Sequence, residues 1–354
     1  MKPISIPANS SRTFTRQDDA IAQKPGFLKI ELHPQTGHLY NATFQLDLIS
    51  YDEKYNTVNP YHFTASIDEF STLLPSLSGS LFVDIGCGQG EFVEFLRSSG
   101  ENAIGFDPVC RNPKEYLFRE LFIPEKISLS RNPSSIVFVM RCVLPHIPNP
   151  FDFIEKIQSF WPNSILVLQH QRLEYFQQTK SWNALMHDHV NVFLKSDFLD
   201  HFEVLQSSEF ANEEWQQIVL KGKSKKSRPS RIESLAIIDN LMYQRERHLA
   251  QVTNFNELFI FGAAGKGINF AFACTNAGIG VSGAIDDNPE IIGRFLEGSG
   301  VEVYSPEDDF VQQANRGSLV VMNHRHLEYA RNKFRNFEQI ESMKTLTESD
   351  LGDQ

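Results

Sequence analysis

The residues best suited to chemistry lie in one stretch, VDIGCGQGEF followed by GFDP, between Val83 and Pro108. Its glycines alternate as Gly86-x-Gly88-x-Gly90, with Asp84 before them and Asp107 further on. Closely spaced glycines let the backbone approach a ligand, and a carboxylate at the end of a strand can accept hydrogen bonds from both hydroxyls of a ribose. We expect the ligand contacts to come from Asp84, Ile85, Gly86, Cys87, Gly88, Gly90, Asp107 and Pro108, and from Arg141 after a later strand.

The elements that position these residues are those of a βαβ unit. Residues 81–85 form a short apolar run that predicts a buried parallel strand, and apolar residues recur at helical spacing over 92–96. Residues 103–106 predict a second strand that ends at Asp107. Further strands at 135–140 and 164–169, a helix at 151–160 and an antiparallel pair within 203–222 continue the pattern. The fold class predicted is α/β, a doubly wound sheet whose ligands bind at the carboxyl ends of its strands.

The spacing of the glycines discriminates between ligands. A dinucleotide turn has the pattern G-x-G-x-x-G, with a pyrophosphate at the start of the following helix. Here the third glycine position holds Glu91, whose carboxylate would oppose a pyrophosphate. The tight G-x-G-x-G after Asp84 instead resembles motif I of class I S-adenosylmethionine-dependent methyltransferases. That resemblance implies S-adenosylmethionine as the cofactor, with Asp107 on its ribose.

A second reactive group is the run Met186-His187-Asp188-His189. An imidazole beside a carboxylate is a general base with a pKa near neutrality, so His189 is a candidate base and His187 a second one. On composition alone the run is also typical of a solvated loop. A metal site would need at least a third ligand, and no convincing set is visible, so we expect no metal. His146, after a predicted strand, either lines the cofactor pocket or packs in the core.

A second strand-glycine-helix pattern begins at residues 258–261 and continues through Gly262, Gly265 and Gly267. Backbone N–H groups at the start of a helix suit an anion, and Lys266 adds positive charge. We interpret the turn as a pocket for a phosphate of the substrate, formed by Gly262, Gly265 and Lys266. The alternative is a turn that only packs. The pattern predicts a second Rossmann-like domain.

Composition excludes several classes of protein. The chain has 354 residues, 41% of them hydrophobic and 22% charged, as in soluble globular proteins. The net charge of −11 argues against nucleic acid as a partner. No apolar run has transmembrane length and the start lacks an apolar signal core, which predicts no membrane contact and a cytoplasmic location. The four cysteines contain no C-x-x-C pair, so we expect reduced thiols.

We divide the chain into three parts. Residues 1–66 form an N-terminal segment with a small hairpin around 33–37. Residues 51–62 are either a surface loop or a lid over the site, and Tyr55 and Tyr61 are expected to contact the substrate. Residues 67–222 form the cofactor-binding domain, and residues 223–354 a linker helix and the second Rossmann-like domain. Residues 1–25 and those from Gln339 onward are polar and are expected to be poorly ordered. The basic run 221–231 is interpreted as a linker rather than an anion-binding patch.

Several motifs together resemble the S-adenosylmethionine-dependent C-methyltransferases that act on nucleotide-linked keto-deoxysugars. They are NATFQLDLISYDEKYNTVNPYHF, VDIGCGQGEF, RCVLPHIPNPFDFI, MHDHVNVFLKSDF, GAAGKG, DDNPEIIGRFLEGSGVEVYSPED and VVMNHRHLEYA. The resemblance implies methylation of the carbon beside a carbonyl, with His189 as base and Asp188 as its partner. It also implies a C-terminal domain that helps to hold an activated sugar.

The chain departs from that family at three points. Pro145 replaces the glutamate of the family's Leu-Glu-His-Ile core, and Met186 and Asp188 replace the tyrosine and glutamate of its Tyr-His-Glu-His stretch. No cysteine precedes Cys87, so the family's N-terminal zinc module is expected to be absent or without metal. These departures keep two alternatives open: an O- or N-methyltransferase of a natural-product or polysaccharide pathway, and a cofactor-binding protein without turnover. The acceptor and the oligomeric state are not predicted.

Overall fold

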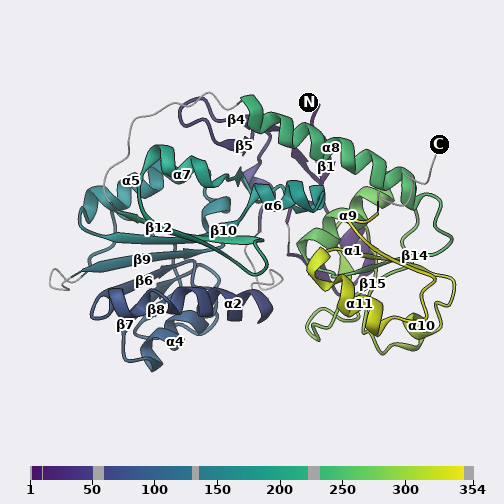
Figure 1. The fold of residues 1–354 in the computed structure, drawn as a ribbon. Helices are drawn as coiled ribbons and strands as arrows, with labels where there is room; N and C mark the ends of the chain where they lie inside the picture. Colours follow the sequence, from purple (N-terminus) through teal and green to yellow (C-terminus); the bar gives the residue numbers. More distant parts are fainter. Residues whose placement is uncertain (1, 10, 51–59, 130–134, 222–231, 347–354) are drawn as a thin grey trace.

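The structure, a computed structural model, describes residues 2–9, 11–50, 60–129, 135–221 and 232–346. Two open sheets lie side by side, and the long helix α8 (Ile232–Val252) lies above their junction and reaches over the second sheet (Figure 1). Within the described part of the chain, no helix combines the length and apolar character that crossing a membrane requires.

The first sheet has seven strands in the order β12-β13-β10-β9-β6-β7-β8. Its strands are β6 (Leu81–Ile85), β7 (Asn102–Phe106), β8 (Leu117–Phe118), β9 (Ile136–Arg141), β10 (Ile165–Gln171), β12 (Glu203–Phe210) and β13 (Trp215–Lys221). The strands from β10 to β8 are parallel, whereas β13 is antiparallel to both β10 and β12. The predicted doubly wound sheet and its antiparallel edge are therefore confirmed.

Helices cover both faces of this sheet because its central strands are apolar on both sides (Figure 1). Leu81, Val83 and Ile85 of β6 belong to the core formed with α5 (Pro150–Phe160) and α7 (Lys195–His201). Phe82 belongs to the opposite core, with α2 (Pro60–Ser71) and α4 (Glu91–Ser98). Since side chains alternate along a strand, Asp84 shares the face of Phe82.

The second sheet has five parallel strands in the order β17-β15-β14-β18-β19. Its strands are β14 (Leu258–Phe261), β15 (Gly283–Ile285), β17 (Val303–Tyr304), β18 (Ser318–Val321) and β19 (Gln339–Ser342). Counted along the chain this is the order 3-2-1-4-5 of a doubly wound sheet, which confirms the second Rossmann-like unit. Its helices are α9 (Gly265–Asn276), α10 (Asp309–Gln312), η4 (His324–His326) and α11 (Leu327–Lys333).

Short antiparallel strands tie the N-terminal residues to the rest of the chain. They are β1 (Ile4–Ile6) with β3 (Gly26–Leu28), β2 (Thr13–Phe14) with β16 (Phe295–Leu296), and the hairpin β4 (Ile30–Leu32) and β5 (Leu39–Asn41) with β11 (Asn191–Val192). The predicted hairpin around 33–37 is thus confirmed, and its third strand comes from the segment that follows His189.

The described residues before 26 are ordered, contrary to the prediction from their polarity. The buried carboxylate of Glu297 accepts hydrogen bonds from the N–H groups of Ala8 at 3.1 Å and Asn9 at 3.2 Å. Burial raises the pKa of Glu297 to about 7. The acceptor for the N–H groups of Ala8 and Asn9 is therefore 289 and 288 residues away along the chain.

Three other features of the structure are not specified by the local sequence pattern. Residues 60–77 form two helices, α2 and α3 (Leu74–Leu77), because Pro75 lacks the N–H that a continuous helix needs. Residues 339–342 form β19, and Met343 and Leu346 beyond it are fully buried. The strand β8 has only two residues, too few to produce a periodic pattern.

The remaining helices are α1 (Gln17–Ile21), α6 (Leu173–Gln178), η1 (Leu46–Leu48), η2 (Leu144–His146) and η3 (Trp182–Ala184).

We expect Gly267→Ala to lower the free energy of unfolding by about 1–3 kcal/mol, measured by urea denaturation. A Cβ at Gly267 would lie 2.0 Å from the carbonyl oxygen of Gly262, so α9 or the preceding turn would have to move. Gly280→Ala is the matched control, because a Cβ there meets no atom within 4 Å, and its effect should stay within about 0.5 kcal/mol. Equal losses in the two variants would contradict the close packing of α9 on β14.

Candidate active site

The turn between β6 and α4 is built on left-handed glycines. The φ angles are 74° at Gly86, 59° at Gly88 and 95° at Gly90, a region that residues with a Cβ rarely adopt. Space is also lacking, because a Cβ on Gly86 would lie 2.3 Å from Val143 and one on Gly90 would lie 2.5 Å from Leu117. The turn therefore presents backbone rather than side chains at the carboxyl end of β6.

Asp107, directly after β7, is bound to this turn. Its Oδ2 accepts a hydrogen bond from the N–H of Gly88 at 2.9 Å, and its Oδ1 accepts one from the N–H of Val109 at 2.8 Å. Burial raises the pKa of Asp107, and these two donors oppose that shift. Each carboxylate oxygen has a second lone pair, so Asp107 can still accept from two ribose hydroxyls.

Asp84 is enclosed in the same site. Its side chain is 1% exposed, and neither oxygen accepts a hydrogen bond from the residues that the structure describes. The Nη2 atom of Arg141, at the end of β9, lies 3.7 Å from Asp84 Oδ2, and its guanidinium lies 4.1 Å over the ring of Phe92. Burial raises the pKa of Asp84 to about 6, although Arg141 opposes the shift. A buried carboxylate with unfilled acceptor sites fits a cationic group such as the ammonium or sulfonium of S-adenosylmethionine.

The other residues predicted to bind the cofactor contribute backbone hydrogen bonds within the turn and side chains that pack around it. The N–H groups of Gly86 and Cys87 both donate to the carbonyl oxygen of Phe106, which holds the turn against β7. Ile85 and Cys87 are buried, and burial raises the pKa of the Cys87 thiol, so it is neutral. Pro108 is exposed beside Asp107.

His187 is a structural residue rather than a base. Its Nδ1–H donates to the carbonyl oxygen of Phe27 at 2.8 Å, and its Nε2 accepts from the N–H of Gln45 at 3.2 Å. The ring is fully buried against Gly26, where a Cβ would lie 2.5 Å from its Cγ. Because both ring nitrogens are bound to backbone groups, His187 has no position for a substrate proton. The alternative base inferred from sequence is therefore not supported.

His189 is partly exposed and packs edge-on against His146, with the ring centroids 4.7 Å apart and an interplanar angle of 81°. His146, in η2 after β9, donates from Nδ1 to the backbone oxygen of Asp188 at 2.8 Å. Burial lowers the pKa of His189 to about 4, with His146 adding to the shift and Asp188 opposing it. At neutral pH His189 is thus an uncharged imidazole that can accept a proton.

The same three residues form a group that could hold a metal ion. The ligand atoms of His146, Asp188 and His189 all lie within 4.8 Å of one another. Two imidazoles and a carboxylate suit a divalent transition metal. His146 precedes Asp188 by 42 residues, so only the fold assembles the set. The expectation that the chain offers no ligand set is therefore wrong, while the absence of a metal stays a prediction.

The predicted lid residues are not placed. Tyr55 lies outside the described residues, as does the side chain of Tyr61. The basic run 222–231 lies outside them as well.

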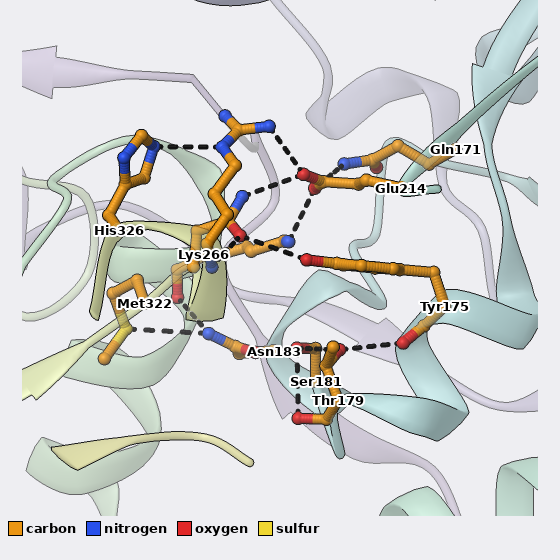
Figure 2. A network of polar contacts seen from close by, with 11 residues as sticks. Gln171, Tyr175, Thr179, Ser181, Asn183, Glu214, Lys266, Met322 and His326 are labelled. Carbon is orange, nitrogen blue, oxygen red and sulfur yellow. Dashed lines mark hydrogen bonds and ion pairs between the residues drawn. The ribbon is translucent and has the colours of Figure 1, made fainter. Parts of the chain in front are cut away.

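The second glycine turn faces the first domain. The φ angle of Gly262 is 101°, and the N–H of Ala263 donates to Asp286 Oδ2 at 2.8 Å, which repeats the contact between the first glycine turn and Asp107. Lys266 Nζ donates to Oε1 of the fully buried Glu214 at 2.7 Å (Figure 2). Lys266 therefore holds a carboxylate of the chain itself.

Sequence reasoning missed some of these residues for identifiable reasons. Asp286 follows β15 as Asp107 follows β7, so the rule that found Asp107 could have found Asp286. Glu214 belongs to none of the quoted motifs, and Arg325 lies in VVMNHRHLEYA, where no binding role was assigned to it. Only the contact between the β12–β13 turn and the second sheet brings Glu214 to Lys266 and Arg325. His146 was noted, but its contact with His189 could not be inferred.

Residues 58–205 match the family model of a methyltransferase domain. Among solved structures, the chain is similar to the N-methyltransferase NodS from Bradyrhizobium japonicum WM9, with 15% identity, 47% of this chain and 98% of that chain covered, and a TM-score of 0.33. It is also similar to magnesium protoporphyrin IX methyltransferase from Synechocystis PCC 6803 with bound SAH, with 14% identity, 47% and 90% covered, and a TM-score of 0.35. No curated protein matches the sequence.

The TM-scores are low, so the assignment rests on the family match and on the site. The matched residues include the glycine turn, Asp84, Asp107 and the segment that carries His189. The strand order and the cradle formed by the turn agree with this match. The cofactor of this domain is S-adenosylmethionine.

We expect Asp107→Ala to weaken S-adenosylmethionine binding by roughly 1.5–3 kcal/mol, because charge-assisted hydrogen bonds to the ribose are lost and the Gly88 N–H loses its acceptor. Calorimetric titration measures this change. Asp152→Ala on the exposed side of α5 is the control and should bind like the parental protein. Unchanged affinity in Asp107→Ala would remove Asp107 from the cofactor site.

Proposed function

We propose that this chain, an S-adenosylmethionine-dependent methyltransferase, methylates the carbon beside the carbonyl of a nucleotide-linked keto-deoxysugar. Such a reaction needs a base for the α-proton. The observation that carries the proposal is the position of His189, an uncharged and partly exposed imidazole whose ring contacts His146 in the loop after β9. Since β9 is the neighbour of β6 in the sheet, the base and the cofactor turn share the carboxyl edge.

The backbone around His189 supports a defined position for its ring. The side chain of Asn191 donates to the carbonyl oxygen of Ile147 at 2.7 Å and holds β11 to the loop after η2. His146 binds the Asp188 carbonyl from the same loop. Preorganisation of this kind favours proton transfer because the base need not search for its geometry.

The residues of the chain divide the chemistry as follows. Asp84, Asp107 and the glycine turn hold the cofactor, which supplies the methyl group when bound. A ring nitrogen of His189 would take the α-proton, and the electron pair of the broken C–H bond would form the new bond to the methyl carbon. The bond between that carbon and sulfur would break, and its electron pair would stay on sulfur. The charge of Asp188 stabilises the imidazolium, which then returns its proton to solvent.

The substrate class rests on the C-terminal half. The motifs GRFLEGSG and YSPED resemble those of the sugar C-methyltransferases. The turn formed by Gly262, Gly265 and Lys266 is proposed to bind a phosphate of the substrate, and Tyr55 and Tyr61 are proposed to cover the sugar.

We expect His189→Gln to lose methyl transfer by about 10²–10⁴-fold or more and to lose solvent deuterium exchange at the substrate α-carbon, while S-adenosylmethionine affinity stays unchanged. Exchange is followed by mass spectrometry of the keto-sugar in D2O. His33→Gln, in the turn between β4 and β5, is the control. Near-parental turnover in His189→Gln would dismiss its role as base, and methyl transfer without exchange in the parental enzyme would favour an oxygen or nitrogen acceptor.

The rate of the parental enzyme should rise with pH through a pKa of about 4, because His189 acts as a base only when it is unprotonated. The contribution of this group should be flat between about pH 6 and 8, whereas an unperturbed imidazole would give a rise in the neutral range. Asp188→Asn should move the rising limb to lower pH, since the charge of Asp188 raises the pKa of His189. A limb near neutrality that Asp188→Asn leaves in place would contradict this assignment.

A further inference from the structure

A cluster of polar contacts between the two sheets is centred on an anion, the carboxylate of Glu214 (Figure 2). The carboxylate of Glu214 accepts from Lys266 Nζ at 2.7 Å and from Arg325 Nη1 at 2.8 Å. It also accepts from Asn323 Nδ2 at 2.8 Å and from Gln171 Nε2 at 3.2 Å. The side chains of Lys266 and Arg325 are only 10% and 5% exposed, so two cations are gathered where little water reaches them.

The position of this cluster in the second sheet is one at which doubly wound folds bind ligands. Lys266 lies on the helix after β14, and Asn323 and Arg325 come directly after β18. β14 and β18 are parallel neighbours, and the strand order reverses between them. In doubly wound sheets, ligands bind outside the carboxyl ends of the strands at this reversal point.

The anion itself comes from the other domain. Glu214 ends the turn between β12 and β13, in which Ala211, Asn212 and Glu213 have φ angles of 51°, 57° and 65°. Three consecutive residues with a Cβ in this region cost conformational free energy. The contacts of Glu214 offset that cost, so its release would let the turn relax.

The cluster is joined by hydrogen bonds to the segment that carries His189. The side chain of Asn183 donates to the carbonyl oxygen of Lys266 at 3.2 Å. Asn269, on the same helix as Lys266, donates to the carbonyl oxygens of Asn183 at 3.1 Å and Leu185 at 2.8 Å. A group bound at Lys266 would therefore rest on the helix that also supports residues 183–189.

We infer that Lys266, Arg325 and Asn323 form the binding site for a diphosphate group of the substrate, and that Glu214 occupies this site until the substrate displaces it. A diphosphate has more charge and more acceptor oxygens than one carboxylate, so it competes for the same donors. The identity of the substrate rests on the proposed function, whereas the site rests on the contacts above.

The test is calorimetric titration of the full chain with inorganic pyrophosphate and, separately, with uridine diphosphate. Glu214→Gln removes the charge of the competitor and keeps its shape, so both ligands should bind at least about tenfold more tightly than to the parental protein. Adding Lys266→Gln to this variant should abolish the gain. Glu213→Gln, an exposed acid one residue away, is the matched control and should bind like the parental protein.

Equal pyrophosphate affinity in the parental protein and in Glu214→Gln would overturn the inference, as would a gain that survives Lys266→Gln. A gain for pyrophosphate alone would overturn the assignment to a nucleotide-linked substrate. If thermal unfolding shows that Glu214→Gln does not fold, Glu214→Asp replaces it with the same expected direction, because the shorter side chain holds both cations less well. Methyl transfer is not measured in these titrations, so failure of the proposed acceptor would leave their outcome unchanged.

Discussion

The arrangement of the candidate site depends on how residues 182–192 are held between the two sheets. Trp182 donates to His248 of α8 at 3.1 Å, and Asn269 of α9 binds the backbone of the same segment. His187 binds the backbone of β3, and Asn191 binds the loop after η2. Buried polar groups require partners, so these contacts from four sides define one path for the segment. His189 lies where this segment meets His146, at the carboxyl edge of the first sheet.

Three buried carboxylates of this protein have different roles, and their hydrogen bonds distinguish these roles. Glu297 accepts from backbone N–H groups and fixes the N-terminal residues. Glu214 is surrounded by donors from two domains. Asp84 accepts no hydrogen bond from the described residues, and its pKa is raised to about 6. Asp84 has Arg141 as a cationic neighbour at 3.7 Å and still has unfilled acceptor sites that fit a cationic ligand, whereas the donors around Glu214 would suit an anionic one.

The two doubly wound sheets contain the same hydrogen bond between an aspartate and a glycine turn, but the residues around the two turns differ. In both, an aspartate after the second strand accepts from the glycine turn after the first, as Asp107 does from Gly88 and Asp286 from Ala263. The first turn remains lined by backbone. The second is followed by Lys266, whose charge is met by Glu214. The two turns therefore differ in Lys266, which follows the second turn, and in the β12–β13 hairpin, whose Glu214 contacts it.

The sequence by itself determined the elements whose signal is local. The strands at 81–85 and 258–261 were predicted to the residue, because apolar runs bounded by glycines specify a buried parallel strand without reference to the rest of the chain. The position of Asp107 at the end of the next strand was also predicted, whereas its hydrogen bond from Gly88 was not. Only the tertiary structure decided that His146 meets His189, that His187 is buried with its ring bound to backbone groups, and that Glu214 accepts from Lys266. These contacts join residues far apart in sequence. The spacing of apolar and polar residues along the chain does not indicate which distant donor will bind a buried acceptor.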